Sequence, residues 1–351
     1  MHLLHLYFID KTRGLSHLWD RLPLLLLDGP ACPILNPLKI KFMNMSASLK
    51  QCYDLLNKTG RASAITISFL RKDLRDALCL FYLVLRAVDT VEDDMTIPDD
   101  IKVTMLTSFD KYLLDPTWRY TESNDEYAVV LENFPCISKS LRELPSKYRA
   151  IITERGCQIG KGMANFVGKE LMTSEYINEY CKQVAGVFCI GVTRLFVASG
   201  LEPEVPDTSA IIQASLFLHK INMIRDFKKD WQCGRLYYAG DVWSKYINNP
   251  GDFLKPENFD KGVKCVNELV TDALQYLIPY LGFLKTLSSE SAIKFFGIHQ
   301  IMAIATLERC YNNPMVFMES VSISREETGE IIKSASILAE IVGKIQYYTE
   351  R

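Results

Sequence analysis

Apolar residues dominate four long stretches of the chain. The stretch 73–94 is almost continuously apolar through its middle, where only Arg86 and Asp89 interrupt it. A helix that is apolar on every side is one that is buried on every side. Three further stretches have the same character: 176–200, 209–230 and 291–313. Gly200 marks an expected helix end. Strand-like alternation, hairpin turns and repeats of solenoid length are nearly absent, so the pattern predicts an all-α single domain with a central ring of apolar helices.

The first part of the chain differs from the rest. Residues 1–45 contain several prolines and show no sustained period, so we interpret them as an atypical N-terminal lead and assign the helical domain to 46–351. The apolar run 22–27 is too short to cross a membrane, and no run of about 18 apolar residues occurs elsewhere. The pattern therefore predicts no transmembrane segment.

Composition narrows the classes of function. The chain has 351 residues and a net charge of −2 at pH 7, which gives no reason to expect nucleic acid as a partner. An anionic substrate would have to be held by a local cluster of charge or by metal. The ten cysteines are scattered without the spacing of a zinc site, and no secretory signal is recognised, so we expect reduced thiols in a cytoplasmic protein.

Polar side chains form one stripe on each of two apolar helices. In the stretch 73–94, Arg86, Asp89 and Asp93 are spaced i, i+3, i+7, and Glu92 lies beside them. In the stretch 209–230 the corresponding stripe is His219, Asn222, Asp226 and Asp230. Carboxylates spaced in this way suit Mg²⁺, which keeps part of its water shell and bridges to substrate phosphates.

A solvated helix end is the ordinary explanation for a single acidic pair. Here two such pairs each close a nearly all-apolar helix, and each is preceded by an arginine. An apolar interior capped by Mg²⁺ is what an isoprenoid diphosphate requires. The metal stabilises the departing diphosphate, and the apolar walls keep water away from the carbocation.

Five segments of the chain resemble the squalene synthase family, within the wider squalene/phytoene synthase group. They are LFYLVLRAVDTVEDDMTI, YCKQVAGVFCIGVTRLF, NMIRDFKKDWQCGRLYY, DVWSKY…DFLKPEN and IMAIATLERCYNN. The resemblance runs from about residue 48 to at least 320. It implies a class I isoprenoid synthase-like helical bundle around a central apolar cavity. It also implies a reaction in which two farnesyl diphosphates form presqualene diphosphate, which NADPH then reduces to squalene.

The resemblance also implies roles for individual residues. The first acidic motif, with Asp89, Glu92 and Asp93, is intact, as is its Arg86. Tyr180 matches the family's catalytic tyrosine. Arg61 matches an arginine that binds diphosphate, Phe295 matches an aromatic residue expected to face cationic intermediates, and Asn222 lies at the NADPH end of the pocket.

Departures from the family pattern suggest a changed reaction. In the second acidic motif Lys229 replaces a glutamate and is expected to face the site, where it either weakens metal binding or contacts diphosphate. Lys228 is expected to be solvated. His219 stands where the family usually has glutamine, and His299 where it has proline. Ser322 and Ser324 replace basic residues thought to hold the NADPH phosphate, although Arg325 remains beside them.

Three interpretations follow. The first is a diverged enzyme that ionises farnesyl diphosphate and transfers or rearranges the farnesyl group, to an acceptor that the sequence does not name, without NADPH reduction. In this case His219 or His299 is a candidate base, although each is also explained as a packed, hydrogen-bonded residue. The second is a working squalene synthase that uses Mg²⁺ and NADPH. The third is a catalytically silent paralogue that binds prenyl lipids.

The remaining expectations concern the state of the protein. We expect a monomer in the cytoplasm. Peripheral contact with the surface of the endoplasmic reticulum is left open.

Overall fold

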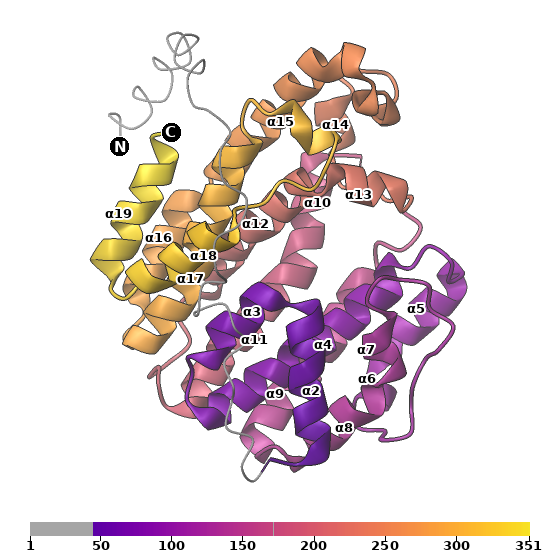
Figure 1. Ribbon diagram of the computed structural model, residues 1–351. Coiled ribbons are helices and arrows are strands. Elements are labelled where there is room, and N and C mark those ends of the chain that lie inside the picture. The colour runs from indigo at the N-terminus through magenta and orange to yellow at the C-terminus, as the bar shows by residue number, and fades with distance from the viewer. Residues whose placement is uncertain (1–44, 171) are drawn as a thin grey trace.

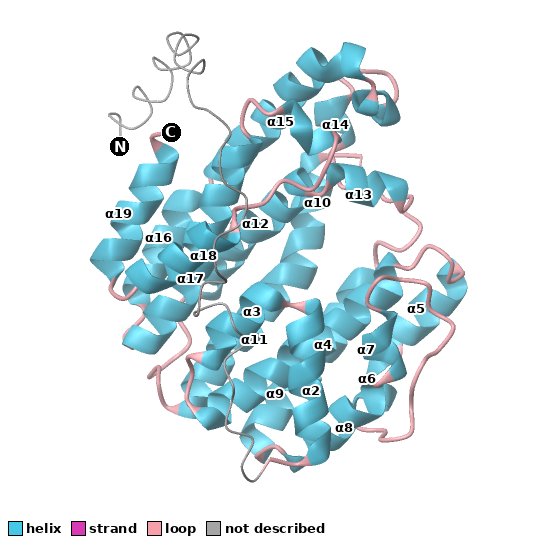
Figure 2. Cartoon of the chain, viewed as in Figure 1, coloured by secondary structure: helices cyan, strands magenta, loops and turns pink. Residues whose placement is uncertain are grey.

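The structure of the protein is a computed structural model that describes residues 45–170 and 172–351. The predicted N-terminal lead therefore lies almost entirely outside the described residues. Every regular element in the described part is a helix (Figure 2), so the predicted all-α class is confirmed.

The first half of the described chain forms eight helices. Their bounds are α2 (Ala47–Thr59), α3 (Arg61–Ser68), α4 (Lys72–Asp93), α5 (Asp99–Thr107), α6 (Phe109–Leu113), α7 (Ala128–Glu132), α8 (Phe134–Glu143) and α9 (Ser146–Ala164). Ser46 caps the first of them, because its hydroxyl accepts a hydrogen bond from the backbone N–H of Leu49.

The second half contains the remaining helices. They are α10 (Ser174–Cys181), α11 (Val187–Ser199), α12 (Thr208–Arg225), α13 (Phe227–Gln232), α14 (Gly240–Trp243), α15 (Phe259–Leu274), α16 (Leu277–Thr286), α17 (Glu290–Cys310), α18 (Arg325–Ser334) and α19 (Leu338–Thr349). A π-helical turn, Lys182–Gly186, joins α10 to α11. Short 3₁₀ turns occupy Pro250–Leu254, Pro256–Asn258 and Pro314–Phe317.

The two halves of the chain lie on opposite sides of the segment that runs from α10 to α11. In Figure 1 the indigo and purple helices α2 to α9 gather on one side, and the orange and yellow helices α15 to α19 gather on the other. The α11 helix contacts α4 and α9 from the first group and α12 from the second. The central segment therefore bridges the two groups of helices.

Two of the four predicted apolar helices are continuous. The α4 helix covers the predicted stretch 73–94 and α17 covers most of 291–313. The stretch 176–200 is helical but includes the π turn, and it ends as predicted at Gly200, whose φ of 79° is left-handed.

The prediction of one helix over 209–230 is wrong at its end. Asp226 has φ −99° and ψ 13°, which separates α12 from α13. Its carboxylate is bound by the guanidinium of Arg225, the residue before it. The stripe of polar side chains therefore changes direction at Asp226.

One helical segment of the described residues, Ser174–Ser199, is long and apolar enough to cross a membrane by length and composition. This segment comprises α10, the π turn and α11, and its neighbours on both sides are helices of the bundle. Its apolar character is accounted for by this central position.

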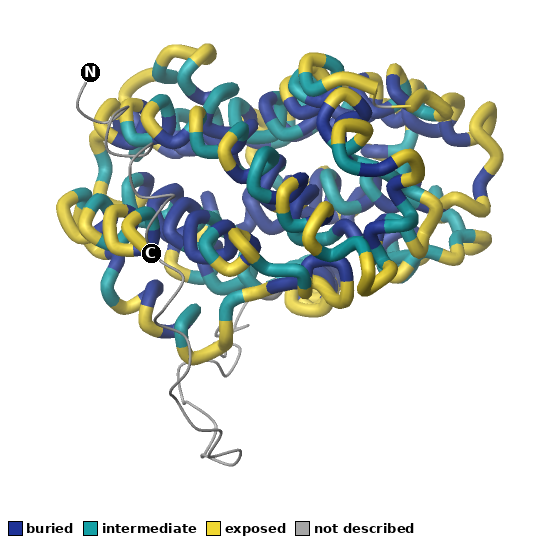
Figure 3. Tube along the Cα trace, turned by 90° about the horizontal axis from the view of Figure 1, so that it is seen from above, coloured by how far each residue is buried: buried dark blue, intermediate teal, exposed yellow. Residues whose placement is uncertain are grey.

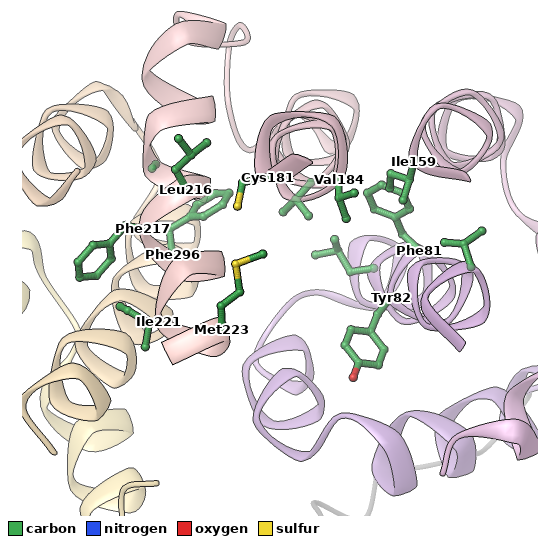
Figure 4. Close-up of a cluster of buried hydrophobic side chains, with 14 of the residues drawn as sticks. Phe81, Tyr82, Ile159, Cys181, Val184, Leu216, Phe217, Ile221, Met223 and Phe296 are labelled. Carbon is green, nitrogen blue, oxygen red and sulfur yellow. The ribbon is translucent and has the colours of Figure 1, made fainter. Parts of the chain in front are cut away.

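Side chains from both groups of helices fill the interior. Figure 4 shows Phe81 of α4 and Ile159 of α9 on one side of Val184, and Phe217 of α12 on the other. Phe81 and Phe217 are completely buried. Seen from above, the buried positions lie along the inner faces of the helices and the exposed ones at the periphery (Figure 3). The apolar helices thus form one shared core, as the pattern predicted.

The contact between α17 and α19 gives a test of this packing. A Cβ on Gly297 of α17 would lie 2.3 Å from Cδ1 and 2.8 Å from Cγ1 of Ile341, which is completely buried. We expect Gly297→Ala to lower the free energy of unfolding by about 1–3 kcal/mol, as overpacking does.

Gly343→Ala on α19 is the matched control, because no atom lies within 4 Å of its added Cβ. This substitution should stabilise the protein by up to about 1 kcal/mol through helix propensity. Denaturant unfolding measures both variants. Equal changes in the free energy of unfolding for Gly297→Ala and Gly343→Ala would show that α17 and α19 are not packed as described.

Candidate active site

The last two turns of α4 carry the first acidic cluster. Asp89 forms an ion pair with Arg86 one turn before it, and both side chains are about one-quarter exposed, at 29% and 23%. Glu92 and Asp93 follow and are half-buried. Lys102 of α5 donates a hydrogen bond from Nζ to the backbone carbonyl of Glu92, at 2.7 Å. A buried cation at this position satisfies a free carbonyl at the end of the helix and complements its dipole.

Arg235 joins this cluster to the second one. Its Nε lies 3.2 Å from Oδ1 of Asp93, and its Nη2 lies 3.0 Å from Oδ1 of Asp230. Its Nη1 also donates to the backbone carbonyl of Asp93, at 2.9 Å. A single guanidinium therefore contacts both acidic clusters, and the expectation that the two helix ends meet agrees with this geometry.

Burial makes two carboxyls of the acidic ends harder to ionise. Burial, followed by the charge of Asp89, raises the pKa of Asp93 to about 7. Burial also raises the pKa of Asp230 to about 6, against the opposing effect of Arg235. Asp226 differs. Although burial opposes its ionisation, its hydrogen bonds with Arg225 and Ser320 hold its pKa below the usual value.

Tyr180 lies directly beneath the first cluster. The tyrosine is 3% exposed, and its hydroxyl donates a hydrogen bond to Oε2 of Glu92 at 2.8 Å. Burial and then the charge of Asp93 raise the pKa of Glu92, and burial and then the charge of Glu92 raise the pKa of Tyr180. The tyrosine is therefore a hydrogen-bond donor here and not a phenolate.

Tyr237 completes this arrangement. Its ring stacks on Tyr180 with centroids 5.9 Å apart, and its hydroxyl donates to Oδ1 of Asp93 at 3.2 Å. Tyr237 thus fixes the position of both a carboxylate and the Tyr180 ring.

Lys229 lies at the same end of the molecule, beside Tyr127. Its Nζ forms an ion pair with Glu126 at 2.6 Å and lies 5.5 Å from the centroid of the Tyr127 ring. The guanidinium of Arg86 lies over the same ring, 4.6 Å from its centroid. Lys229 therefore lies among the cationic and acidic groups of the site, and its side chain is 44% exposed.

Two neighbouring residues make structural contacts, and the first of them differs from expectation. Lys228 is not simply solvated, because its Nζ donates to the backbone carbonyl of Met318. Asp94, which extends the first acidic cluster in the sequence, is buried and accepts hydrogen bonds from Thr96, Ser123 and the backbone N–H of Asn124. These hydrogen bonds hold the loop that leads to Tyr127, and they occupy both oxygens of the Asp94 carboxylate.

The two candidate histidines have different surroundings. His299 is satisfied at both nitrogens. Its Nδ1 bonds the carbonyl of Phe295 at 2.7 Å, and its Nε2 lies 3.4 Å from Oγ1 of Thr66. His219 packs against Tyr180 with ring centroids 5.5 Å apart and the ring planes tilted by 50°, and its Nδ1 is buried with no hydrogen-bond partner in the described part of the chain.

The other predicted residues are placed as follows. Phe295 is half-buried and packs against Phe196 at 5.5 Å and Phe296 at 5.4 Å. Asn222 is exposed on α12. Arg61 begins α3, and its side chain lies outside the described residues, so its predicted contact with diphosphate stays a prediction.

The carboxylates of the site suit a Mg²⁺ ion that keeps water and phosphate ligands better than a metal ion held by protein side chains alone. Among residues 45–170 and 172–351, no three acidic, histidine or cysteine side chains are close enough together to hold one ion by themselves. Magnesium is held in proteins by one or two carboxylates, water and substrate phosphate. Burial is the main cause of the raised pKa values of Asp93 and Asp230, and a divalent cation beside these carboxyls would favour their ionised forms.

Sequence reasoning missed Arg235, Tyr237 and Tyr127. The first two lie in the segment CGRLYY, which follows the second acidic motif and belongs to one of the segments that carry the family resemblance. Their charge and aromatic character were the available signal. Tyr127 had no such signal, because its loop reaches the site through tertiary contacts, those of Asp94 with Ser123 and Asn124 and that of Glu126 with Lys229.

An all-helical bundle with two acidic helix ends joined above a buried tyrosine has the features expected of an enzyme that transfers prenyl groups. The chain belongs to the squalene/phytoene synthase family, because residues 56–327 match the model of the family described as Squalene/phytoene synthase.

Similar proteins agree with this assignment. The chain is 42% identical to the squalene synthase of Rattus norvegicus over 309 residues, which cover 88% of this chain and 74% of that protein. It is 39% identical to squalene synthase 1 of Arabidopsis thaliana over 296 residues, with 83% and 72% covered.

A solved structure, the complex of TcSQS with the ligand E5700, superposes with a TM-score of 0.83 at 34% identity and covers 87% of this chain and 90% of that one. A dehydrosqualene synthase complex, with a TM-score of 0.55 at 16% identity over 88% of this chain and 99% of that one, shares the fold. The predicted isoprenoid synthase fold is therefore confirmed.

The raised pKa values predict how stability depends on pH. Between the ordinary carboxyl pKa of 3.8 and the folded value of about 7, the folded protein retains a proton on Asp93 that the unfolded chain has lost. This carboxyl therefore lowers the free energy of unfolding as pH rises through that window, and the loss is complete above it.

Mg²⁺ should offset this loss of stability at the higher pH values, where protons no longer compete with it for the carboxylates. We expect Mg²⁺ with inorganic diphosphate to raise the melting temperature more at pH 7.5 than at pH 5.5. Asp93→Asn should remove most of the difference, and Asp94→Asn, which changes the carboxylate of the loop, should not. Differential scanning fluorimetry measures the shifts, and equal shifts at both pH values in the parent protein would contradict the assignment.

Proposed function

We propose that this chain uses Mg²⁺ to ionise farnesyl diphosphate and then transfers or rearranges the farnesyl group, without the NADPH-dependent reduction to squalene. The observation that supports the ionisation step most directly is the Arg235 bridge between Asp93 and Asp230, next to the hydrogen bond between Tyr180 and Glu92. Anion-binding and cation-binding groups are thereby gathered at one end of an apolar bundle.

The acidic residues and the nearby cations divide the work of ionisation. When bound, Mg²⁺ supplies electrostatic stabilisation of the leaving diphosphate. Asp89, Glu92, Asp93, Asp226 and Asp230 are the carboxylates proposed to hold it. As the C1–O bond breaks, the electron pair leaves with the diphosphate.

Three cations are placed to receive the negative charge that develops on the diphosphate. Arg86 and Lys229 flank Tyr127, and Arg235 already contacts two carboxylates of the site. In the free protein Lys229 is paired with Glu126. Diphosphate would replace this carboxylate, whose side chain is 58% exposed and can be solvated by water once released.

The apolar faces of the central helices are suited to the carbocation. Several of their side chains stay half-buried although they lie in the middle of helices. They are Phe188 and Cys189 of α11, Leu218 of α12, and Phe295 and Met302 of α17. We infer that these side chains border the space for the prenyl tail, where they exclude water and, at Phe295, present an aromatic ring to positive charge.

The proposed lack of NADPH reduction has support near α18. Ser322 and Ser324 carry no charge, and the hydroxyl of Ser324 caps α18 by accepting from the backbone N–H of Glu327. Arg325 is exposed at the helix start, where a phosphate would have one cation. The position is therefore poorer in positive charge than the family pattern implies.

A complete squalene synthase is the second candidate. Its support is the 42% identity to a protein with that name over most of both chains. A silent prenyl-lipid-binding paralogue has less support, because the acidic ends and Tyr180 form one connected network.

One assay separates these functions. Purified protein is incubated with farnesyl diphosphate and Mg²⁺, with and without NADPH, while diphosphate release and organic products are measured. We expect diphosphate release in both conditions, loss of release in Asp89→Asn, and no squalene. Squalene formed only with NADPH would establish the second candidate, and binding without release would establish the third.

Lys229 predicts a further change in metal dependence. Lys229→Glu replaces a cation with a carboxylate beside Asp226 and Asp230, so it should lower the Mg²⁺ concentration that gives half-maximal diphosphate release. An effect of severalfold is expected, since the side chain is 44% exposed and screened by solvent.

The control for Lys229→Glu is Lys228→Glu, which makes the same change of charge one residue earlier. Lys228 is directed to the carbonyl of Met318, so this variant should have a smaller effect on metal dependence. The same shift in both variants would mean that general charge, and not the position of Lys229, controls metal binding.

A further inference from the structure

His219 has an unusual combination of burial and an unused hydrogen-bonding atom. It lies on α12 against the ring of Tyr180, and its Nδ1 is buried without a partner in the described part of the chain. Buried polar atoms are normally paired, because an unpaired one costs free energy. Burial also lowers the pKa of His219 to about 4, so the ring is neutral at physiological pH. A neutral imidazole offers a lone pair at one of its two nitrogens.

The position of His219 along α12 relates it to the acidic end. His219 precedes Asp226 by seven residues, which places it on nearly the same face and roughly 10 Å away along the helix axis. A prenyl chain with its diphosphate at the acidic end and its tail along α12 would pass this side chain. The position is therefore next to the carbons of the substrate and not next to its diphosphate.

Other nearby groups are less able to accept a proton from those carbons. Tyr180 is neutral and its hydroxyl donates a hydrogen bond to Glu92, and burial keeps the pKa of Tyr180 above the usual value. His299 has partners at both nitrogens, Phe295 and Thr66. Of the two histidines that the sequence offers as bases, only His219 has a nitrogen free of hydrogen bonds.

We propose that His219 is the base that ends the reaction, by removing a proton from a carbon adjacent to the cationic carbon of the farnesyl-derived intermediate. In this step a C–H bond breaks, its electron pair forms a carbon–carbon double bond, and the proton passes to the imidazole. No reductant or oxidant is required. Because such a C–H group is far more acidic than an imidazolium, a weakly basic imidazole is sufficient.

This inference rests on the proposed function and adds the fate of the cation to it. An enzyme that ends its reaction by proton loss forms an olefin without hydride transfer. This agrees with the lower positive charge around Ser322 and Ser324, where the family pattern has basic residues for the NADPH phosphate. Glutamine, which the family usually has at this position, has an amide that is not a comparable base.

The experiment separates ionisation from proton removal. His219→Gln and His219→Phe are compared with the parent protein in farnesyl diphosphate and Mg²⁺ without NADPH. Diphosphate release reports ionisation, and the ratio of olefins to water-captured alcohols reports how the cation ends. Ser215→Ala is the control, because Ser215 is a buried polar residue one turn earlier on α12 whose hydroxyl bonds only the local carbonyl of Ile212.

We expect both His219 variants to keep diphosphate release within about threefold while the ratio of olefin to alcohol falls at least tenfold. This fall is smaller than the ~10²–10⁴-fold contribution of a general base, because released diphosphate also accepts protons. The control should retain the parent ratio. Circular dichroism melting verifies that the variants are folded, and the glutamine variant tests the step if the phenylalanine variant is not.

Three results would overturn the inference. An unchanged ratio with intact release in both variants would show that His219 is not the base, and the proposed ionisation would stand. A parent protein that forms only alcohols would show that no proton is removed. Absence of diphosphate release from the parent protein would instead refute the proposed function itself, and this inference with it.

Discussion

The burial of acidic side chains at two helix ends that meet is the constraint on which the rest of this structure depends. Asp93 and Asp230 are close enough to share Arg235, yet the pKa of each carboxyl remains above its usual value. Burial therefore disfavours the ionised forms of these carboxyls in the free protein. A metal ion with its diphosphate would favour those ionised forms, so the site is organised for binding at some cost to the stability of the free protein.

The bundle is what brings this charge to one place. The central segment from α10 to α11 separates the helices of the first half of the chain from those of the second, and it carries Tyr180 next to the acidic ends. Below these ends most buried side chains of the helices are apolar, although the buried Lys220 of α12 forms an ion pair with Asp272. His219 lies between the acidic ends and this largely apolar interior. This division allows ionisation to occur at one end while the resulting cation is kept from water at the other.

The substitutions that distinguish this chain act on particular parts of that arrangement. Lys229 introduces a cation next to the acidic ends, but it forms an ion pair with Glu126 and lies over the ring of Tyr127. Ser324 loses the charge of a basic residue and gains a role as a helix cap. His219 introduces an unpaired nitrogen beside Tyr180. The first two changes are locally compensated, whereas the third leaves a buried polar atom without a partner, so it is the change that structure alone explains least.

The sequence determined the helical class, the four apolar helices and the two acidic motifs, because hydrophobic periodicity and the i, i+3, i+4 spacing of side chains are local properties of a helix. Only the tertiary structure decided how Arg235 and Tyr237 join those motifs, that Asp94 holds a loop, that α12 stops at Asp226, and which histidine keeps a free nitrogen. Apart from the end of α12, where the neighbouring Arg225 binds Asp226, each of these depends on contacts between residues far apart in the chain. A side chain's partner is set by the packing of helices against one another, and the pattern along one helix does not contain that information.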